Sequence, residues 1–308
     1  RFASRFKAAL GMLGVVLSLA TAGVDDTWTA YLTTPPALAL NLTDQLLTRA
    51  DQLAAGVTSP QVSGDVDLVV SGGGNFDAYY MGAQTVFSRV KDLTVHRYSG
   101  ASAGGMMPYE FVLKGEKTTV ASHFSYGELC SQYPDSFSSF LSAAYEQDHH
   151  WRLMAGWQTQ QYGPQLAQLN GVVYVALTCF TPLPTLEWVH NYTAAGDQAT
   201  QAFMGTGTYI EMYQGKLCSD GGAASGRDMT PLFHDKLRPQ IIINLMKTGA
   251  RAGMVMAPIN TTEYFDLALK GQEDAVAFLT QGTGTAMSLC PVDASTEGNV
   301  CKVAEVVV

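Results

Sequence analysis

Two short apolar runs, each ended by a glycine-rich turn and followed by a helical pattern, constrain the fold of this chain most. The first run, residues 66–70, ends at Ser71-Gly72-Gly73-Gly74, and residues 78–90 then show a helical pattern. The second run, residues 93–98, leads through another glycine-bounded turn into a helical stretch over residues 103–114. Parallel strands joined by crossover helices produce this order, so the sequence predicts an α/β fold.

The second half of the chain continues the same mixture of elements. Residues 171–178 have the apolar character of a strand buried on both faces. Residues 213–218 and 240–245 predict two shorter strands, and residues 262–280 predict a helix with its charged residues on one side. At 308 residues and 47% hydrophobic content, the chain can form one large domain with a substantial core.

The N-terminal end has the three-part layout of a secretory signal peptide. A basic cluster in residues 1–7 precedes an apolar run over residues 8–22, which ends in Ala20-Thr21-Ala22 before an acidic pair. We expect residues 1–22 to be a signal peptide or an uncleaved signal anchor, because the run approaches the ~18 to 20 residues that span a bilayer. The protein is then expected in the secretory pathway, either secreted, lumenal or membrane-anchored through this segment.

Three N-glycosylation sequons agree with a secretory route. They begin at Asn41, Asn191 and Asn260. We therefore expect these three asparagines to carry glycans.

The cysteines also fit an oxidising compartment. The chain has five, an odd number, so at least one is expected to be free or paired with another chain. Cys290 and Cys301 could close a short C-terminal loop, whereas Cys179 lies in an apolar strand-like run and is expected to be a buried thiol.

The charge of the chain argues against a nucleic acid as partner. The formal net charge is −9, whereas affinity for nucleic acids comes largely from clustered Lys and Arg side chains. The sequence has neither calcium-loop nor zinc-ligand spacing, so we expect no metal and no other cofactor.

Ser102 is the candidate nucleophile. It lies at the centre of Gly100-Ala101-Ser102-Ala103-Gly104, between an apolar strand and an apolar helix. A sharp turn there would hold its hydroxyl out of the sheet, and the helix N-terminus would face developing negative charge. Gly100 and Gly104 avoid side chains that would crowd the turn. The alternative is an ordinary serine that caps the helix.

A serine nucleophile needs donors for the oxyanion that its attack creates. Backbone N–H groups in a glycine turn can converge on an anion, which makes Gly72, Gly73 and Gly74 the candidate oxyanion hole. A flexible loop without this role is the alternative.

The nucleophile also needs a base. Asp220 stands at the end of a predicted strand, and Gly221 and Gly222 after it would let the chain turn toward Ser102 without steric conflict. A carboxylate with an ordinary pKa of about 4 is a weak base, so partial burial would have to raise that pKa. The six histidines lie in less promising surroundings. A plain Asp-Gly turn is the alternative.

These three motifs, in this order, resemble those of the patatin-like phospholipases, and the resemblance covers residues 66–279. It implies a three-layer α/β/α fold with a mainly parallel central sheet. It also implies a Ser-Asp dyad in which Ser102 attacks an acyl ester and Asp220 takes its proton. The implied substrates are phospholipids or related glycerolipids, presented on a membrane or micelle surface, and the implied activity is that of a carboxylic ester hydrolase without a metal.

We expect the chain to have four segments. After the signal segment, residues 23–64 form a helical or linker segment whose residues 40–55 are amphipathic. Residues 65–285 form the patatin-like catalytic domain, and residues 286–308 form a C-terminal tail.

The chain departs from the family pattern after the glycine triplet. The family usually has Arg or Lys followed by Gly there, and this chain has Phe76 and Asp77. Asp77 would bring a carboxylate close to the oxyanion, and the loss of one oxyanion-hole donor typically costs ~10² to 10³ in rate. A catalytically degenerate lipid-binding or storage glycoprotein is therefore one alternative.

An α/β-hydrolase esterase with a triad of Ser102, Asp220 and His234 is the other alternative, because the three residues occur in the chain order of that fold. The short interval from Asp220 to His234 and the few strands before the nucleophile count against it.

Overall fold

A computed structural model describes residues 29–31, 33–132, 140–180, 182–192, 211–222, 224–225, 230–235, 237–249, 260–297 and 300–302. The expected signal segment, residues 1–22, lies outside these ranges. No helix within them is long and apolar enough to cross a bilayer.

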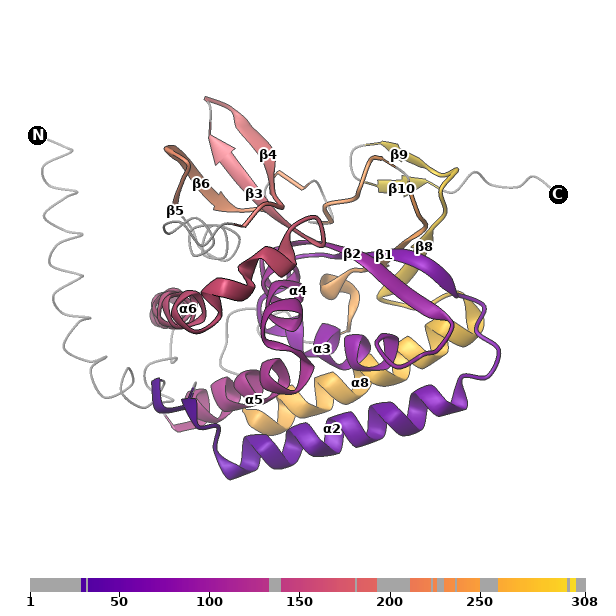
Figure 1. The fold of residues 1–308 in the computed structure, drawn as a ribbon, viewed down its shortest axis with the longest axis horizontal. Coiled ribbons are helices and arrows are strands. Elements are labelled where there is room, and N and C mark those ends of the chain that lie inside the picture. Colours follow the sequence, from indigo (N-terminus) through magenta and orange to yellow (C-terminus); the bar gives the residue numbers. More distant parts are fainter. Residues whose placement is uncertain are drawn as a thin grey trace, which may run out of the picture.

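The central feature is a mixed β-sheet with parallel strands in its middle (Figure 1). Its strands are β1 (Gly64–Val70), β2 (Leu93–Ala101), β3 (Val173–Phe180), β4 (Pro184–Val189), β5 (Glu211–Tyr213), β6 (Lys216–Asp220), β7 (Gln240–Ile243) and β8 (Met287–Cys290). The order is β5-β6-β3-β2-β1-β7-β8, and β4 pairs with β3. Pairing is parallel among β7, β1, β2 and β3 and antiparallel at both ends of the sheet. The predicted α/β fold is confirmed.

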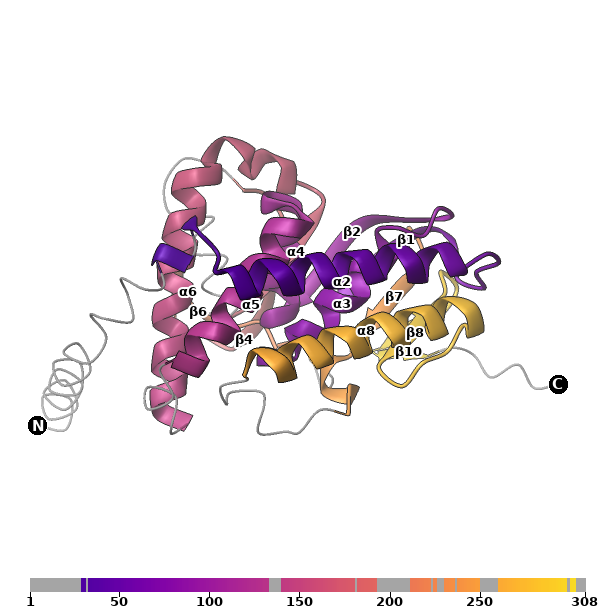
Figure 2. The ribbon, with the colours of Figure 1, turned by 90° about the horizontal axis from the view of Figure 1, so that it is seen from below.

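Helices precede, separate and follow these strands. They are α2 (Ala37–Gly56), α3 (Asp77–Phe87), α4 (Ala103–Lys114), α5 (Glu116–Gln132), α6 (Phe140–Tyr162) and α8 (Thr261–Gln281). Short 3-10 turns occur at η1 (Gly74–Phe76), η3 (Gly163–Leu169) and η4 (Leu245–Lys247), and a small hairpin of β9 (Ser295–Glu297) and β10 (Val300–Lys302) ends the described chain. Figure 1 shows α2 and α8 beneath the sheet, and the view from below in Figure 2 shows them side by side.

The two faces of the sheet differ in what covers them. Alternate residues of β1, such as Leu68 and Val70, pack into a core with α2, α3 and α8. Val69 points the other way and packs with Leu232 and Phe233, from the segment before β7. A complete three-layer arrangement stays a prediction.

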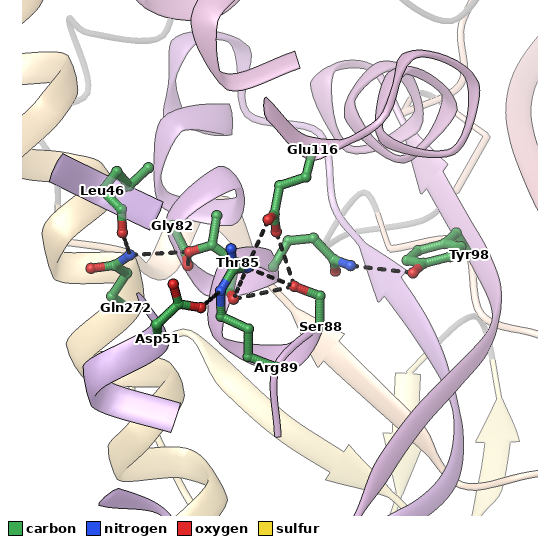
Figure 3. A network of polar contacts seen from close by, with 10 residues as sticks. Leu46, Asp51, Gly82, Thr85, Ser88, Arg89, Tyr98, Glu116 and Gln272 are labelled. Atoms are coloured by element: carbon green, nitrogen blue, oxygen red, sulfur yellow. Dashed lines mark hydrogen bonds and ion pairs between the residues drawn. The ribbon is translucent and has the colours of Figure 1, made fainter. Parts of the chain in front are cut away.

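Helix α2 is part of the main core, not a separate linker. Gln272 on α8 donates a 2.8 Å hydrogen bond to the carbonyl of Leu46 on α2 (Figure 3). Arg89, just after α3, forms ion pairs with Asp51 on α2 at 2.5 Å and with Glu116 on α5 at 2.7 Å. These contacts tie α2 to the helices of the predicted catalytic domain.

The C-terminal region also departs from the predicted boundaries. Residues 286–308 were expected to be a tail, but β8 lies within them and pairs with β7, so the sheet extends past residue 285. The apolar alternation of Met287 and Leu289, which both join the core, explains why this short segment forms an edge strand.

The strand predicted at residues 213–218 is interrupted by a turn: residues 216–218 lie in β6, which continues to Asp220, and Tyr213 ends β5. The chain turns there, and Gln214 and Gly215 link β5 to β6 with positive φ angles of 50° and 77°. A two-residue hairpin turn with positive φ at both positions has a backbone twist that matches the twist of the two strands it joins. Gly215 adopts it without strain, whereas Gln214 is an unusual residue for it.

The structure changes the assignment of the cysteines. Cys290 and Cys301 form the predicted disulfide. Cys179 is not a thiol: it is bonded to Cys218, which lies directly opposite on β6. Cys130 is buried on α5 and keeps its thiol.

The three predicted glycosylation sites are exposed. Asn41 lies on α2, Asn191 follows β4, and Asn260 caps α8 by accepting a 2.9 Å hydrogen bond from the N–H of Glu263. Exposure makes attachment sterically feasible at each, and glycosylation itself stays a prediction.

Candidate active site

Ser102 lies at a sharp turn between β2 and α4. Its φ of 54° and ψ of −136° are outside the ordinary regions for a residue with a side chain. Its carbonyl accepts hydrogen bonds from Gly105 N at 2.8 Å and Met106 N at 3.0 Å, which start the helix. The predicted elbow is therefore present, with the serine half-exposed at its apex.

Gly100 and Gly104 are required by close backbone contacts. A Cβ at Gly100 would lie 1.9 Å from the carbonyl oxygen of Gly104, and a Cβ at Gly104 would lie 2.4 Å from that of Ser71. The second contact also shows that the elbow packs directly against the start of the glycine turn after β1.

Strand register brings Asp220 to Ser102. Ala176 of β3 pairs with Ala101, the last residue of β2, and the next residue of β3, Leu177, pairs with Asp220. β4 pairs with one edge of β3. β2 and β6 share the other edge, and β6 pairs with the part of β3 that lies beyond the end of β2, at the elbow. The Asp220 carboxylate accepts a hydrogen bond from the Ser102 side chain.

The surroundings of Asp220 suit a base. Burial raises the pKa of its carboxyl above the ordinary value, against the opposing effect of hydrogen bonds from Gly222 N–H and Ser102. The Gly222 bond is 2.7 Å long. Gly221 is needed here, because a Cβ would lie 2.0 Å from the carbonyl oxygen of Ala176.

Thr178 is a positioning residue that sequence analysis missed. Its hydroxyl donates to the Asp220 carbonyl at 2.7 Å and accepts from Ala224 N at 3.0 Å, so it fixes the turn after the aspartate from both sides. Its place in an apolar strand gave no indication of this role.

The glycine turn can supply N–H donors. Ser71 anchors it, because its N–H donates to Ile243 O at 2.9 Å and its hydroxyl accepts from Leu245 N at 2.8 Å. The backbone N–H groups of Gly72, Gly73 and Gly74 donate no hydrogen bond to any described residue. The turn therefore leaves donors available next to the elbow, as an oxyanion hole requires.

His234 is not brought to the dyad. It lines a pocket of about 270 Å³ with Arg97 and Tyr174. Arg97 precedes Ser102 by five positions on β2, which corresponds to roughly 16 Å along an extended strand. Within the described residues, the groups that bear on the Asp220 carboxyl are Gly222 and Ser102, and no histidine is among them.

Asp77 faces a buried network instead of the glycine turn. Its carboxylate accepts a 2.5 Å hydrogen bond from the Tyr264 hydroxyl and lies 3.4 Å from His123 Nδ1. The other ring nitrogen of His123 lies 3.0 Å from Glu110, which also pairs with Lys114 at 2.9 Å. These side chains are buried.

The charges of this network compensate one another. Burial opposes the charged imidazole, but hydrogen bonds and charges of Asp77 and Glu110 outweigh it and raise the pKa of His123 to about 9. Burial likewise opposes the Glu110 carboxylate, yet Lys114 and His123 lower its pKa to about 2. Two carboxylates thus face two cations, and the Asp77 charge expected beside the oxyanion is compensated.

His123, which was set aside as a base for Ser102, takes part in this buried network instead. This residue lies in the middle of α5 and is buried. Glu110 and Lys114 form an (i, i+4) pair in an otherwise apolar helix, a signal of buried charge that the sequence analysis did not use.

No group of three His, Cys, Asp or Glu side chains in the described ranges could hold a metal ion. The chain matches no protein-family model, and it has no significant match among curated proteins.

Proposed function

We propose that this chain is a lipid acyl hydrolase that cleaves carboxylic ester bonds of phospholipids or related glycerolipids with a patatin-like fold and a Ser-Asp dyad. The observation that carries the proposal is the hydrogen bond from the Ser102 side chain to the Asp220 carboxylate at a strained strand-to-helix turn.

In the first half of the reaction, Asp220 takes the hydroxyl proton while Ser102 Oγ attacks the ester carbonyl. The oxyanion lies between the N–H groups of the glycine turn and the N-terminus of α4, where both favour negative charge. Collapse expels the alcohol, which receives the proton from Asp220, and leaves an ester on Ser102.

In the second half, Asp220 takes a proton from water as the water attacks the acyl-enzyme. Collapse of the second tetrahedral intermediate returns that proton to Ser102 Oγ and releases the fatty acid. The raised pKa of Asp220 favours proton uptake in both attacks.

The test is fatty-acid release from phospholipid and galactolipid by the protein produced in a secretory host, beside Ser102→Ala and Asp220→Asn. Both variants are expected to lose at least ~10³ in rate. Equal turnover by all three proteins would exclude the dyad. If the unmodified protein has no turnover and a fluorophosphonate does not label Ser102, the lipid-binding or storage glycoprotein becomes the better assignment.

A further inference from the structure

Part of the sheet extends past the end of β2, where the turn with Ser102 lies. β3 pairs with β2 as far as Ala176 and then continues to Phe180. At about 3.3 Å per residue, the end of β3 lies roughly 13 Å beyond the end of β2. β6 runs back from that end to Asp220 beside the elbow. The β3–β4 and β5–β6 hairpins thus project from the rest of the sheet (Figure 1).

The outer end of these hairpins carries exposed apolar side chains. Phe180 pairs with Leu217 across β3 and β6, and Leu217 pairs with Met212 across β6 and β5, so the three share one face. Their exposed fractions are 42%, 44% and 48%, and that of Leu183, between β3 and β4, is 73%. We call these four residues the apolar tip.

The apolar tip is held in place by a disulfide. Cys179 and Cys218, the neighbours of Phe180 and Leu217, are bonded to each other and buried on the opposite face. Because adjacent strand residues point to opposite faces, this bond fixes Phe180 and Leu217 outward. Their exposure is therefore built into the sheet.

The charges near the apolar tip and on the chain as a whole favour a lipid surface without net charge. Lys216 contacts both carboxylate oxygens of Glu187 at 2.7 and 2.8 Å, which compensates its charge. The chain as a whole carries −9, which opposes binding to anionic lipids. A projecting apolar surface with compensated charge complements the interface of neutral or zwitterionic lipids.

We propose that the apolar tip inserts into a neutral or zwitterionic lipid surface and brings Ser102 to its ester bonds. This rests on the proposed function. Asp220 lies three strand residues from Leu217, or roughly 10 Å, and interfacial elements enter the headgroup and acyl boundary by about 5–10 Å. Insertion of the tip to that depth would therefore hold the dyad within about 5 Å of the lipid surface.

Flotation with phosphatidylcholine vesicles measures lipid binding by the apolar tip without requiring ester hydrolysis. Ser102→Ala serves as the background, so that lipid is not consumed. Adding Leu183→Ser and Leu217→Ser should lower the vesicle-bound to free ratio at least about tenfold, because two apolar side chains lose their burial. Leu237→Ser is the matched control, since Leu237 is 64% exposed and precedes β7, which β3, β2 and β1 separate from β6 in the sheet.

A dye attached to the tip gives a second, local measurement. Leu183→Cys and Leu237→Cys proteins are labelled with an environment-sensitive fluorophore, and the buried Cys130 is not expected to compete. Phosphatidylcholine vesicles should shift the emission to the blue at position 183 only. This signal does not depend on contacts that other parts of the chain make with lipid.

Each outcome decides the proposal. Equal flotation of the tip and control variants, an unshifted dye at position 183, binding confined to anionic vesicles or no vesicle binding would overturn it. Failure of the proposed function would look different: the unmodified protein would release no fatty acid while the tip variants still lost vesicle binding. Hydrolysis of a soluble short-chain ester by the Leu183→Ser, Leu217→Ser protein with Ser102 intact shows that its dyad is assembled.

Discussion

The Asp77 carboxylate lies 3.4 Å from Nδ1 of His123, and Nε2 of the same ring lies 3.0 Å from the Glu110 carboxylate. Asp77 begins α3 just after the glycine turn, and Glu110 lies on α4, the helix that begins after Ser102. His123 therefore links the helix behind the candidate oxyanion donors to the helix behind the candidate nucleophile.

Replacing His123 by Gln should destabilise the protein. The variant keeps a hydrogen-bonding side chain but leaves the buried Asp77 and Glu110 carboxylates without the imidazolium, a loss typically of about 3–5 kcal/mol. Urea unfolding measures it. His96→Gln is the control, because His96 pairs with Asp65 at a half-exposed site and should cost less than about 1 kcal/mol. Equal losses would contradict a special role for the network.

Stability should fall as the pH rises through about 9. The pKa of His123 is about 9 in the folded protein, above its ordinary value of 6.5. The charged His123 therefore contributes up to about 3 kcal/mol to the free energy of unfolding. This contribution is fully present below pH 6.5 and is lost as the pH rises through 9. Urea unfolding at pH 6 and pH 9.5 measures the step. If His123→Gln shows a step of the same size, other groups cause it.

The placement of the candidate site residues could be predicted because it depends on local chain chemistry. A Cβ added at Gly100, Gly104 or Gly221 would lie 2.4 Å or less from a backbone oxygen, so the glycines themselves mark the places where segments approach closely. Strand and helix patterns placed Ser102 and Asp220 at element ends, which is where an active site in a parallel sheet forms.

The remaining features depend on contacts that no local pattern encodes. Cys179 was assigned as a thiol because its partner, Cys218, becomes adjacent only through the antiparallel register of β3 and β6. The turn was missed because Gln214 is not a residue that favours positive φ, although Gly215 after it is. His123 gained its role only when α3, α4 and α5 packed together.

Gly104→Ala should both destabilise the protein and disrupt the elbow. Its Cβ would lie 2.4 Å from Ser71 O and 2.5 Å from Val70 O, and backbone cannot yield as a flexible side chain can. We expect a loss of about 1–3 kcal/mol and slower fluorophosphonate labelling of Ser102. Gly56→Ala is the control, since a Cβ there has no neighbour within 4 Å. Similar unfolding curves for both variants would refute the steric argument.

Replacing Cys179 and Cys218 together by alanine should slow the reaction of Ser102 more than replacing Cys290 and Cys301 together by alanine. The first bond spans 39 residues and the second 11, so chain entropy predicts similar stability losses of about 4 and about 3 kcal/mol. Their positions differ, because the first secures the register that sets Asp220 opposite Leu177. We therefore expect slower fluorophosphonate labelling of Ser102 only in the first variant, at a temperature where both are folded. Equal labelling rates would mean that the hydrogen bonds of β3 and β6 hold the register without the disulfide.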